Sequence, residues 1–211
     1  ANTNFLVFFG SSDHFHSQPQ LSMLIALAIK LYSTMQLKSQ QGCRLAIGAY
    51  PTFSYDARGG GGNGYLGPSS HEGVQSLCFD PNTLNIPALN WRTTKLLGLP
   101  LPPGLEITID SQKLEGTLAP ASGSISLEFK AHFRFRVGSL LTAPPLIIDT
   151  CLSSGTVQSQ RHYEKGQALR ADGSAVLVGL ATVKPSGATW LDHFLGLPNE
   201  ALAVLRCELQ S

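Results

Sequence analysis

Charged side chains are scarce in this chain. Only 14% of its 211 residues are Asp, Glu, Lys or Arg, 43% are apolar, and the formal net charge is +1. About 25% charged residues is typical of a soluble domain. A nearly neutral chain has no excess of cations to neutralise phosphates, which excludes a protein built to bind nucleic acid. The low charge favours instead a fold that keeps part of its surface against a membrane or a partner.

Common catalytic and metal-binding motifs are also missing. The chain has no G-x-S-x-G, no H-E-x-x-H and no Cys-x-x-Cys, so it lacks the signatures of a nucleophile elbow, a zinc protease and a zinc knuckle. Its four cysteines are far apart, and we expect free thiols, with two bridges left open as the alternative. Asp13, His14 and His16 could present two imidazoles on one face, but histidines in a polar segment are usually solvated. We predict no metal ion and no cofactor.

The first forty residues differ from the rest and are predicted to form an N-terminal strand and helix extension. Leu21 to Leu37 is apolar except for one narrow stripe, with Ser17 as a possible N-cap and Pro19 in the first turn. The run is shorter than the roughly 20 apolar residues of a membrane span and carries Lys30, so we expect no transmembrane segment. We predict a buried helix docked on a sheet, and a helix that docks on a membrane surface or a partner is the alternative.

Residues 41–211 are predicted to form a single antiparallel β domain with a Gly-rich loop at 58–73. The loop contains a formal G-x-G-x-x-G at Gly62, Gly64 and Gly67, but Pro68 follows where a dinucleotide-binding fold needs a helix. We therefore interpret this segment as a flexible loop without a phosphate site.

From Val74 onward the sequence pattern predicts strands and turns. We expect two strands joined by a tight turn at Ser111 and Gln112, and a doubly buried strand in the apolar run "AVLVGLATV". A short helix is predicted from Trp190 to its stop at Gly196, and Ala201–Leu209 fits a last strand better than a helix. The fold class is therefore mainly β, an antiparallel meander barrel or sandwich of about 8–10 strands with one packed N-terminal helix and a short C-terminal helix.

The stretch "SISLEFKAHFRFRVG", Ser124 to Gly138, alternates apolar and polar residues without a slip. Such a period of two predicts a long strand with one buried and one solvated face. Its apolar face carries Phe129, Phe133 and Phe135, and we expect Trp91 and Trp190 to close around them as an apolar ligand site. The alternative is an interior that side chains fill completely.

The polar face of the same strand becomes basic toward its end, through Lys130, His132, Arg134 and Arg136. These residues are predicted either to pair with acids of neighbouring strands or to form a surface for a partner or an anion.

A catalytic alternative rests on three polar residues. His162 and Tyr163 lie in the densest polar cluster, "QRHYE", and could serve as general acid or base. Asp149 lies in the apolar run "PLIIDTCL", where burial would shift its pKa or an ion pair with Arg134 or Arg136 would hold it. We expect the ion pair, and we expect the protein not to be an enzyme.

Two segments carry a resemblance to other proteins. "FDPNTLNIPALNWRTTKLLGLPLPPGLEI" and "YPTFSYDARGGGGNGYLG" are similar to uncharacterised β-rich proteins of cyanobacteria and chloroplasts. The resemblance covers about half of the chain and brings no fixed catalytic residues. It implies a plastid or cyanobacterial setting, soluble or peripheral at the thylakoid.

The sequence thus supports three hypotheses about function. The first is a non-catalytic β-barrel or sandwich that binds an apolar molecule, such as a lipid or pigment, or acts close to a membrane complex. The second is a scaffold or assembly subunit of a larger complex, with the Leu21–Leu37 helix and the basic strand face covered by another chain. The third is a barrel enzyme that uses His162, Tyr163 or Asp149.

Overall fold

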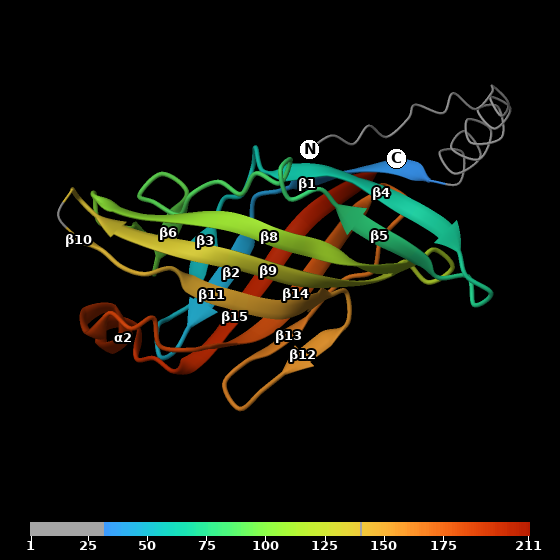
Figure 1. Cartoon of the computed structure of the whole chain (residues 1–211). Coiled ribbons are helices and arrows are strands. Elements are labelled where there is room, and N and C mark those ends of the chain that lie inside the picture. Colours follow the sequence, from blue (N-terminus) through green and yellow to red (C-terminus); the bar gives the residue numbers. More distant parts are fainter. Residues whose placement is uncertain (1–31, 140) are drawn as a thin grey trace, which may run out of the picture. The chain divides into compact units, whose positions relative to one another are not determined.

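The structure is a computed structural model that describes residues 32–139 and 141–211, and the part from Ser33 onward is mainly antiparallel β-sheet (Figure 1). One sheet of 13 strands contains nearly all of it, and β12 and β13 form a separate two-stranded sheet. In chain order the strands are β1 Ser33–Ser39, β2 Cys43–Ile47, β3 Phe53–Tyr55, β4 Gly61–Ser69, β5 Gln75–Phe79, β6 Thr94–Leu96, β7 Leu99–Pro100, β8 Leu105–Ala119, β9 Ser124–Val137, β10 Leu141–Thr142, β11 Leu146–Ser153, β12 Thr156–Gln158, β13 Tyr163–Lys165, β14 Ser174–Val183 and β15 Asn199–Gln210. The helix in the described part is α2, Thr189–Leu195. There are more strands than the predicted 8–10 because several connections contain strands of two or three residues.

The strand pairings follow a circuit that forks at one side. The order β1-β4-β5-β8-β9-β11-β14-β15 returns to its start, because β1 pairs with β4 on one edge and with β15 on the other. β15 also pairs with β2, whose partners continue through β3, β6 and β7. β1 and β2 lie along the same edge of β15, since β1 pairs with its C-terminal half and β2 with Ala201–Val204. The circuit is therefore fully paired at the β1 half. At the β2 half, the connection from β5 to β6 meets β8 through an isolated bridge, Leu89 to Ile107.

The β1 half is filled with side chains. The buried cluster there includes Leu77, Phe79, Ile125, Leu127 and Leu177, all nearly inaccessible to solvent. A second small cluster lies on the opposite face of β14 and β15, where Val178, Leu202 and Val204 are covered by Val157 of β12. β14 is therefore buried on both faces, as its continuous apolar run predicts.

Several other expectations are confirmed. β9 extends from Ser124 to Val137 and alternates in burial as predicted. Ala201–Leu209 belongs to a strand, β15. The C-terminal helix ends at Gly196, which adopts the left-handed conformation (φ 65°) of a helix C-cap.

The predicted N-terminal helix is wrong in its last five residues. Residues 33–37 belong to β1, which pairs on both edges, and the sheet therefore begins before the predicted boundary at residue 41. Backbone pairing on both sides outweighs the local helical pattern of this segment. The preceding residue, Tyr32, belongs to neither a helix nor a strand. Residues 21–31 of the predicted helix, the strand before it and the candidate metal site at Asp13, His14 and His16 lie outside the described residues.

The predicted Gly-rich loop is wrong as well, because Gly61–Ser69 forms strand β4 between β1 and β5. Its glycines leave room for neighbours. A Cβ at Gly62 would lie 2.8 Å from the side chain of Leu84, and one at Gly64 would collide with the carbonyl oxygen of Cys78. Glycine here allows close packing of the strand instead of flexibility.

The predicted turn at Ser111 and Gln112 is a β-bulge within one long strand, β8. The pairing of β8 with β9 shifts by one residue between Ser111 and Lys113, and both flanking segments stay in the ladder. A bulge inserts one extra residue in one strand, which breaks the alternation of side chains without ending the strand.

Candidate functional site

The β2 half of the circuit contains a partly open apolar cavity of about 270 Å³. Its lining comes from β2, β3, β6, β8, β9, β11, β14, β15, α2 and connections beside them, and it contains no charged side chain. The cavity lies where the β2-β3-β6-β7 branch separates from β8, so the fork of the sheet creates the space. The sequence left a filled and a hollow interior open, and the structure has a filled half and a half that contains a cavity.

The three phenylalanines of β9 line this cavity. Phe129, Phe133 and Phe135 are all part of its wall, opposite Ala201 and Ala203 of β15. They face inward because they occupy alternate positions of a strand whose other face carries the charged residues. Phe129 and Phe133 are partly buried, which fits side chains that border an unfilled space.

The two tryptophans do not close over these phenylalanines. Trp91 is 49% exposed and stacks with the guanidinium of Arg92, 4.8 Å from the ring centroid. Trp190 lies in α2 and is 37% exposed. Phe194 and Leu195 of α2 line the cavity instead, and Leu195 could have been identified from the helical spacing in "WLDHFLG".

Two polar side chains border the cavity, and both make hydrogen bonds within the protein. The Thr150 hydroxyl donates to the carbonyl of Leu180 at 2.7 Å, and the Tyr50 hydroxyl donates to the carbonyl of Phe194 at 2.6 Å. The second bond ties the β2–β3 connection to α2 at the end of the cavity. An occupant of this space would therefore meet apolar contacts almost everywhere.

A smaller cavity of about 110 Å³ continues toward the filled half. It shares Leu45, Phe129, Phe133 and Ala203 with the larger one. We refer to the two as the outer chamber and the inner chamber. The inner chamber also has no charged residue in its wall, and its polar members include Tyr55, whose hydroxyl donates to the carbonyl of Pro87. Burial raises the pKa of Tyr55 above its usual range.

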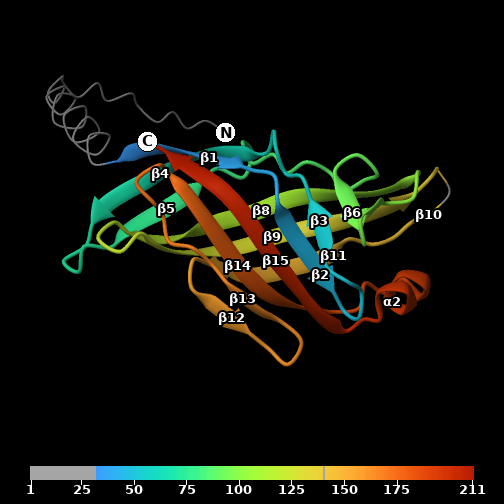
Figure 2. The ribbon, with the colours of Figure 1, turned by 180° about the vertical axis from the view of Figure 1, so that it is seen from behind.

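The outer chamber lies at the end of the sheet that carries the most exposed apolar side chains. In Figures 1 and 2, β6, β10 and α2 lie together at this end, and β1, β4 and β5 lie at the other. We call this region the apolar end, and its exposed members are Trp91, Leu97, Leu99, Val137, Leu141, Trp190 and Phe194. Leu97, at the turn of the β6–β7 hairpin, is 78% exposed and has a positive φ of 52°.

The connection into α2 is held by a carboxylate. Asp192 accepts hydrogen bonds from the backbone N–H and the hydroxyl of Ser186, both at 2.7 Å, and from the backbone N–H of Gly187. The bond from the Ser186 hydroxyl is the main cause that lowers the pKa of Asp192. This network fixes the helix that carries Phe194 and Leu195 into the cavity wall.

The basic face of β9 is paired with carboxylates of its two neighbouring strands. Lys130 contacts Asp149 of β11 at 3.0 Å, Arg134 pairs with Asp110 and Arg136 with Glu106, both of β8. These pairs are exposed, and such surface pairs contribute little stability. They also leave this face without an excess of charge.

His132 lies on the same face, opposite Asp110 of β8 and Ile147 of β11 in the strand register, and it has no ion pair among the described residues. The predicted anion face is therefore largely neutralised within the chain.

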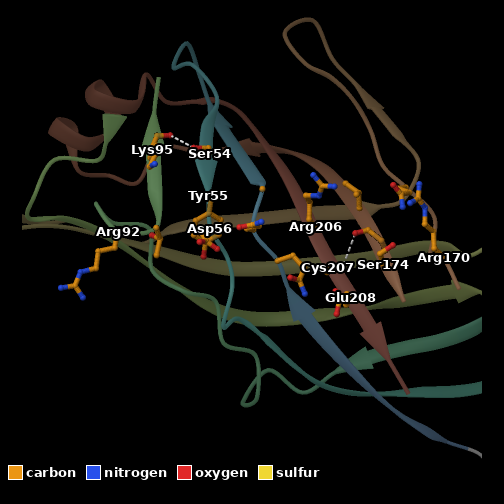
Figure 3. A pocket seen from close by; sticks show the side chains of 17 residues that line it. Ser54, Tyr55, Asp56, Arg92, Lys95, Arg170, Ser174, Arg206, Cys207 and Glu208 are labelled. Carbon is orange, nitrogen blue, oxygen red and sulfur yellow. Dashed lines mark hydrogen bonds between the residues drawn. The ribbon is translucent and has the colours of Figure 1, made fainter. Parts of the chain in front are cut away.

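Cations without a carboxylate partner gather elsewhere, in an open polar groove of about 710 Å³ (Figure 3). Arg92, Lys95, Arg170 and Arg206 line it, and none of them forms an ion pair with a described residue. Of its two acids, Asp56 is paired with Arg58, which lies outside the lining. Arg92 and Lys95 lie in one segment, but Arg170 and Arg206 lie in two others far along the chain, so no sequence pattern indicated the groove.

The candidate catalytic residues are not brought together. Asp149 is exposed on the outer face of β11 and pairs with Lys130, where an ion pair with Arg134 or Arg136 was expected. Tyr163 is exposed on β13, and His162 has a buried Nε2 without a partner among the described residues. Neither chamber nor the polar groove includes any of the three in its lining.

Among residues 32–139 and 141–211, no three His, Cys, Asp or Glu side chains lie close enough to hold a metal ion. Within the same ranges, no helix has the length and apolar character needed to cross a membrane. All four cysteines are free, with Cys43 and Cys207 buried and Cys78 and Cys151 exposed. No protein-family profile, no curated protein and no solved structure matches this chain.

Proposed function

We propose that this protein binds an apolar molecule, such as a lipid or a pigment, inside a β-barrel formed by the circuit of strands. The observation that carries the proposal is the outer chamber, a space of about 270 Å³ whose wall has no charged side chain and no free hydroxyl. Close-packed interiors rarely leave voids larger than a water molecule, so a space of this size needs an explanation. Ligand sites typically have volumes of roughly 300–1,000 Å³ and mostly apolar walls.

The physical reason for binding is the hydrophobic effect. An apolar surface of a ligand that leaves water gains roughly 25 cal/mol per Å² buried. The aromatic rings of Phe129, Phe133 and Phe135 offer a wide contact surface at one side of the chamber, and aliphatic side chains line the other. Because the wall offers no cation, it suits a neutral ligand better than a fatty acid anion.

The first test is the analysis of bound molecules. Protein purified without detergent is extracted with organic solvent and the extract is analysed by mass spectrometry, and the apo protein is titrated with the uncharged fluorophore Nile red. We expect a defined apolar compound in the extract and saturable fluorescence. A protein that is clean after purification and does not bind the probe would refute the proposal.

A matched pair of variants locates the binding. Ala201→Phe places a ring in the outer chamber, and Thr182→Phe places the same ring at an exposed position of β14 outside it. We expect Ala201→Phe to weaken Nile red binding at least about tenfold and Thr182→Phe to leave it unchanged. Equal effects of the two variants would place the probe elsewhere.

A second candidate function is attachment to a lipid bilayer, and the apolar end is the observation that favours it. Exposed leucines of the β6–β7 hairpin, at the same end of the sheet as two partly exposed tryptophans (Figure 1), resemble the way peripheral proteins place apolar and aromatic groups at the interface of a membrane. Arg92, Lys95 and Lys184 lie in the segments of this end and have no ion pair among the described residues. A cationic rim of this kind favours anionic lipids.

The test for attachment is co-sedimentation with vesicles of neutral phosphatidylcholine and with vesicles that contain a third of phosphatidylglycerol. We expect binding that increases with the anionic lipid and that the double variant Leu97→Asp/Leu99→Asp abolishes. Tyr65→Asp, at an exposed position of β4 at the other end of the sheet (Figure 1), is the control and should bind normally. Binding that the double variant does not reduce would contradict this candidate.

The plastid or cyanobacterial setting at the thylakoid remains a proposal that depends on the sequence resemblance. A role as a scaffold subunit has less support than the two candidates above, because the carboxylates of β8 and β11 already neutralise most of the basic face of β9.

A further inference from the structure

One buried hydroxyl in the chamber wall has no hydrogen-bond partner. The Oγ atom of Ser111 is inaccessible to solvent, and no described residue donates to it or accepts from it. Ser111 lines the inner chamber, among the side chains of Ile109, Leu114, Phe129 and Phe133. Buried polar atoms are nearly always paired, so each exception needs a physical reason.

The alternation of β8 places this hydroxyl inside, at the last position before the β-bulge. Before the bulge, Ile107 and Ile109 face the cavities, and Ser111 is next in the same alternation. Beyond the bulge the inward series continues with Leu114, while Lys113 faces outward and pairs with Glu115 and Glu128. The extra residue therefore turns a lysine away from the interior and leaves one serine at the inner end of an apolar space.

The other hydroxyl groups of the chamber walls are satisfied. Ser39 donates to the carbonyl of Ala57 at 2.7 Å, Tyr55 to that of Pro87, and Thr150 and Tyr50 make the bonds described above. In the described part of the chain, Ser111 thus offers the one free hydroxyl in an interior that is otherwise closed to polar interactions.

We propose that the Ser111 hydroxyl is the hydrogen-bond anchor for a ligand that carries one neutral oxygen at its inner end. This inference depends on the proposed binding of an apolar molecule. The ligand class is a mono-oxygenated apolar compound, an alcohol, aldehyde or ketone, whose hydrocarbon part fills the outer chamber. A serine hydroxyl both donates and accepts, so it serves any of these oxygens. A carboxylate does not fit, because neither chamber offers a cation to offset its burial.

The test compares three probes that share one hydrocarbon skeleton: farnesol, the hydrocarbon farnesene and farnesoic acid. Each displaces Nile red from the apo protein, and the ratios of their dissociation constants are measured for the wild type and for Ser111→Ala. One added hydrogen bond is worth about 2- to 12-fold in affinity. We expect farnesol to bind tighter than farnesene by such a factor, farnesoic acid to bind weakest at neutral pH, and Ser111→Ala to remove the preference for the alcohol.

The matched control is Thr150→Val, which removes a wall hydroxyl that already has a partner and should leave the ratio of alcohol to hydrocarbon unchanged. Ser111→Ala loses no bond within the protein, so we expect its unfolding midpoint in the apo form to be unchanged or higher. An equal ratio in wild type and Ser111→Ala, or tightest binding of the acid, would overturn the role of Ser111 and leave the apolar site intact. Failure of all three probes to displace Nile red would instead count against the proposed function itself.

Discussion

The hollow β2 half leads to a prediction about stability. Ala203 of β15 lines both chambers, opposite Leu45 of β2 and Gly179 of β14 in the strand register. It is partly buried, although its strand is paired on both edges. Substitution of Ala203 by Leu adds three carbon atoms at a point where the wall borders empty space. We therefore expect Ala203→Leu to stabilise the apo protein, which is the opposite of the usual effect of enlarging a buried residue.

The magnitude follows from the hydrophobic effect. Each buried methylene contributes about 0.8 kcal/mol, so three contribute at most about 2.4 kcal/mol. Fixing the leucine side chain costs about 0.5–1 kcal/mol of rotamer entropy. The net gain in the free energy of unfolding is then about 1–2 kcal/mol. For a chain of this size it corresponds to a rise in Tm of about 2–8 °C.

The assay is urea unfolding of delipidated protein, followed by circular dichroism, with Tm from calorimetry. Ala131→Leu is the control, because Ala131 also faces inward on β9 but is 1% exposed and lines neither chamber. We expect it to destabilise by about 1–3 kcal/mol through overpacking. If Ala203→Leu lost more than about 1 kcal/mol, as the control should, the chambers would not be empty space in solution and the reasoning would be refuted.

Three further predictions concern the filled half and the thiols. Leu127→Ala, at 0% exposure in the main cluster, should cost about 2–5 kcal/mol in urea unfolding, while Leu97→Ala at the apolar end should stay within about 0.5 kcal/mol; similar costs for both would contradict the assigned core. Burial raises the pKa of the Cys207 thiol to about 12 from an ordinary 9.0, so above about pH 9 the unfolded chain loses this proton and the folded chain keeps it. The free energy of unfolding should then fall by up to about 1.4 kcal/mol per pH unit for this group, and Cys207→Ala should flatten that slope between about pH 9 and 11; an unchanged slope would assign it to other groups. Ellman's reagent should modify Cys78 and Cys151 in the folded protein and the two buried thiols after unfolding, and four fast thiols would contradict the described burial.

The parts of the fold that the sequence predicted are those where one pattern decides the structure. In β9, each inward position is apolar and each outward position is polar from Ser124 to Arg136, so a period of two is the sole regular structure that buries the one set and solvates the other. The phenylalanines of the cavity wall were therefore identified from this strand alone. α2 was also predicted from the sequence, because its apolar residues follow a helical spacing that ends at a glycine. In the structure this glycine adopts the left-handed conformation.

The predictions were wrong where contacts between distant parts of the chain determine the secondary structure. Residues 33–37 follow a helical pattern locally, but both of their edges pair with strands about 30 and 170 residues away along the chain. Gly62 and Gly64 look like a flexible loop until Leu84 and Cys78 are placed against them. The ion-pair partners of the basic face of β9 also depend on contacts between distant parts of the chain. Lys130, Arg134 and Arg136 pair with acids on two different strands, and the register of those strands, which sets each pair, cannot be read from β9.

The bulge in β8 and the fork at β15 together explain why the interior has a hollow half. With no bulge, the alternation that directs Ile107 and Ile109 inward would also direct Lys113 inward, where no carboxylate could pair with it; one extra residue places Leu114 there instead, and Leu114 packs into the filled half. On the opposite wall, β1 continues the closed ladder beside the filled half, whereas β2 leads the sheet away through β3, β6 and β7 beside the hollow half. The change of register in β8 and the branch that begins at β2 border the same interior, and Ser111 lies beside the register change, in the wall of the inner chamber. A sequence pattern that breaks at one residue thus marks the boundary between the part of the sheet that provides stability and the part that has room for a ligand.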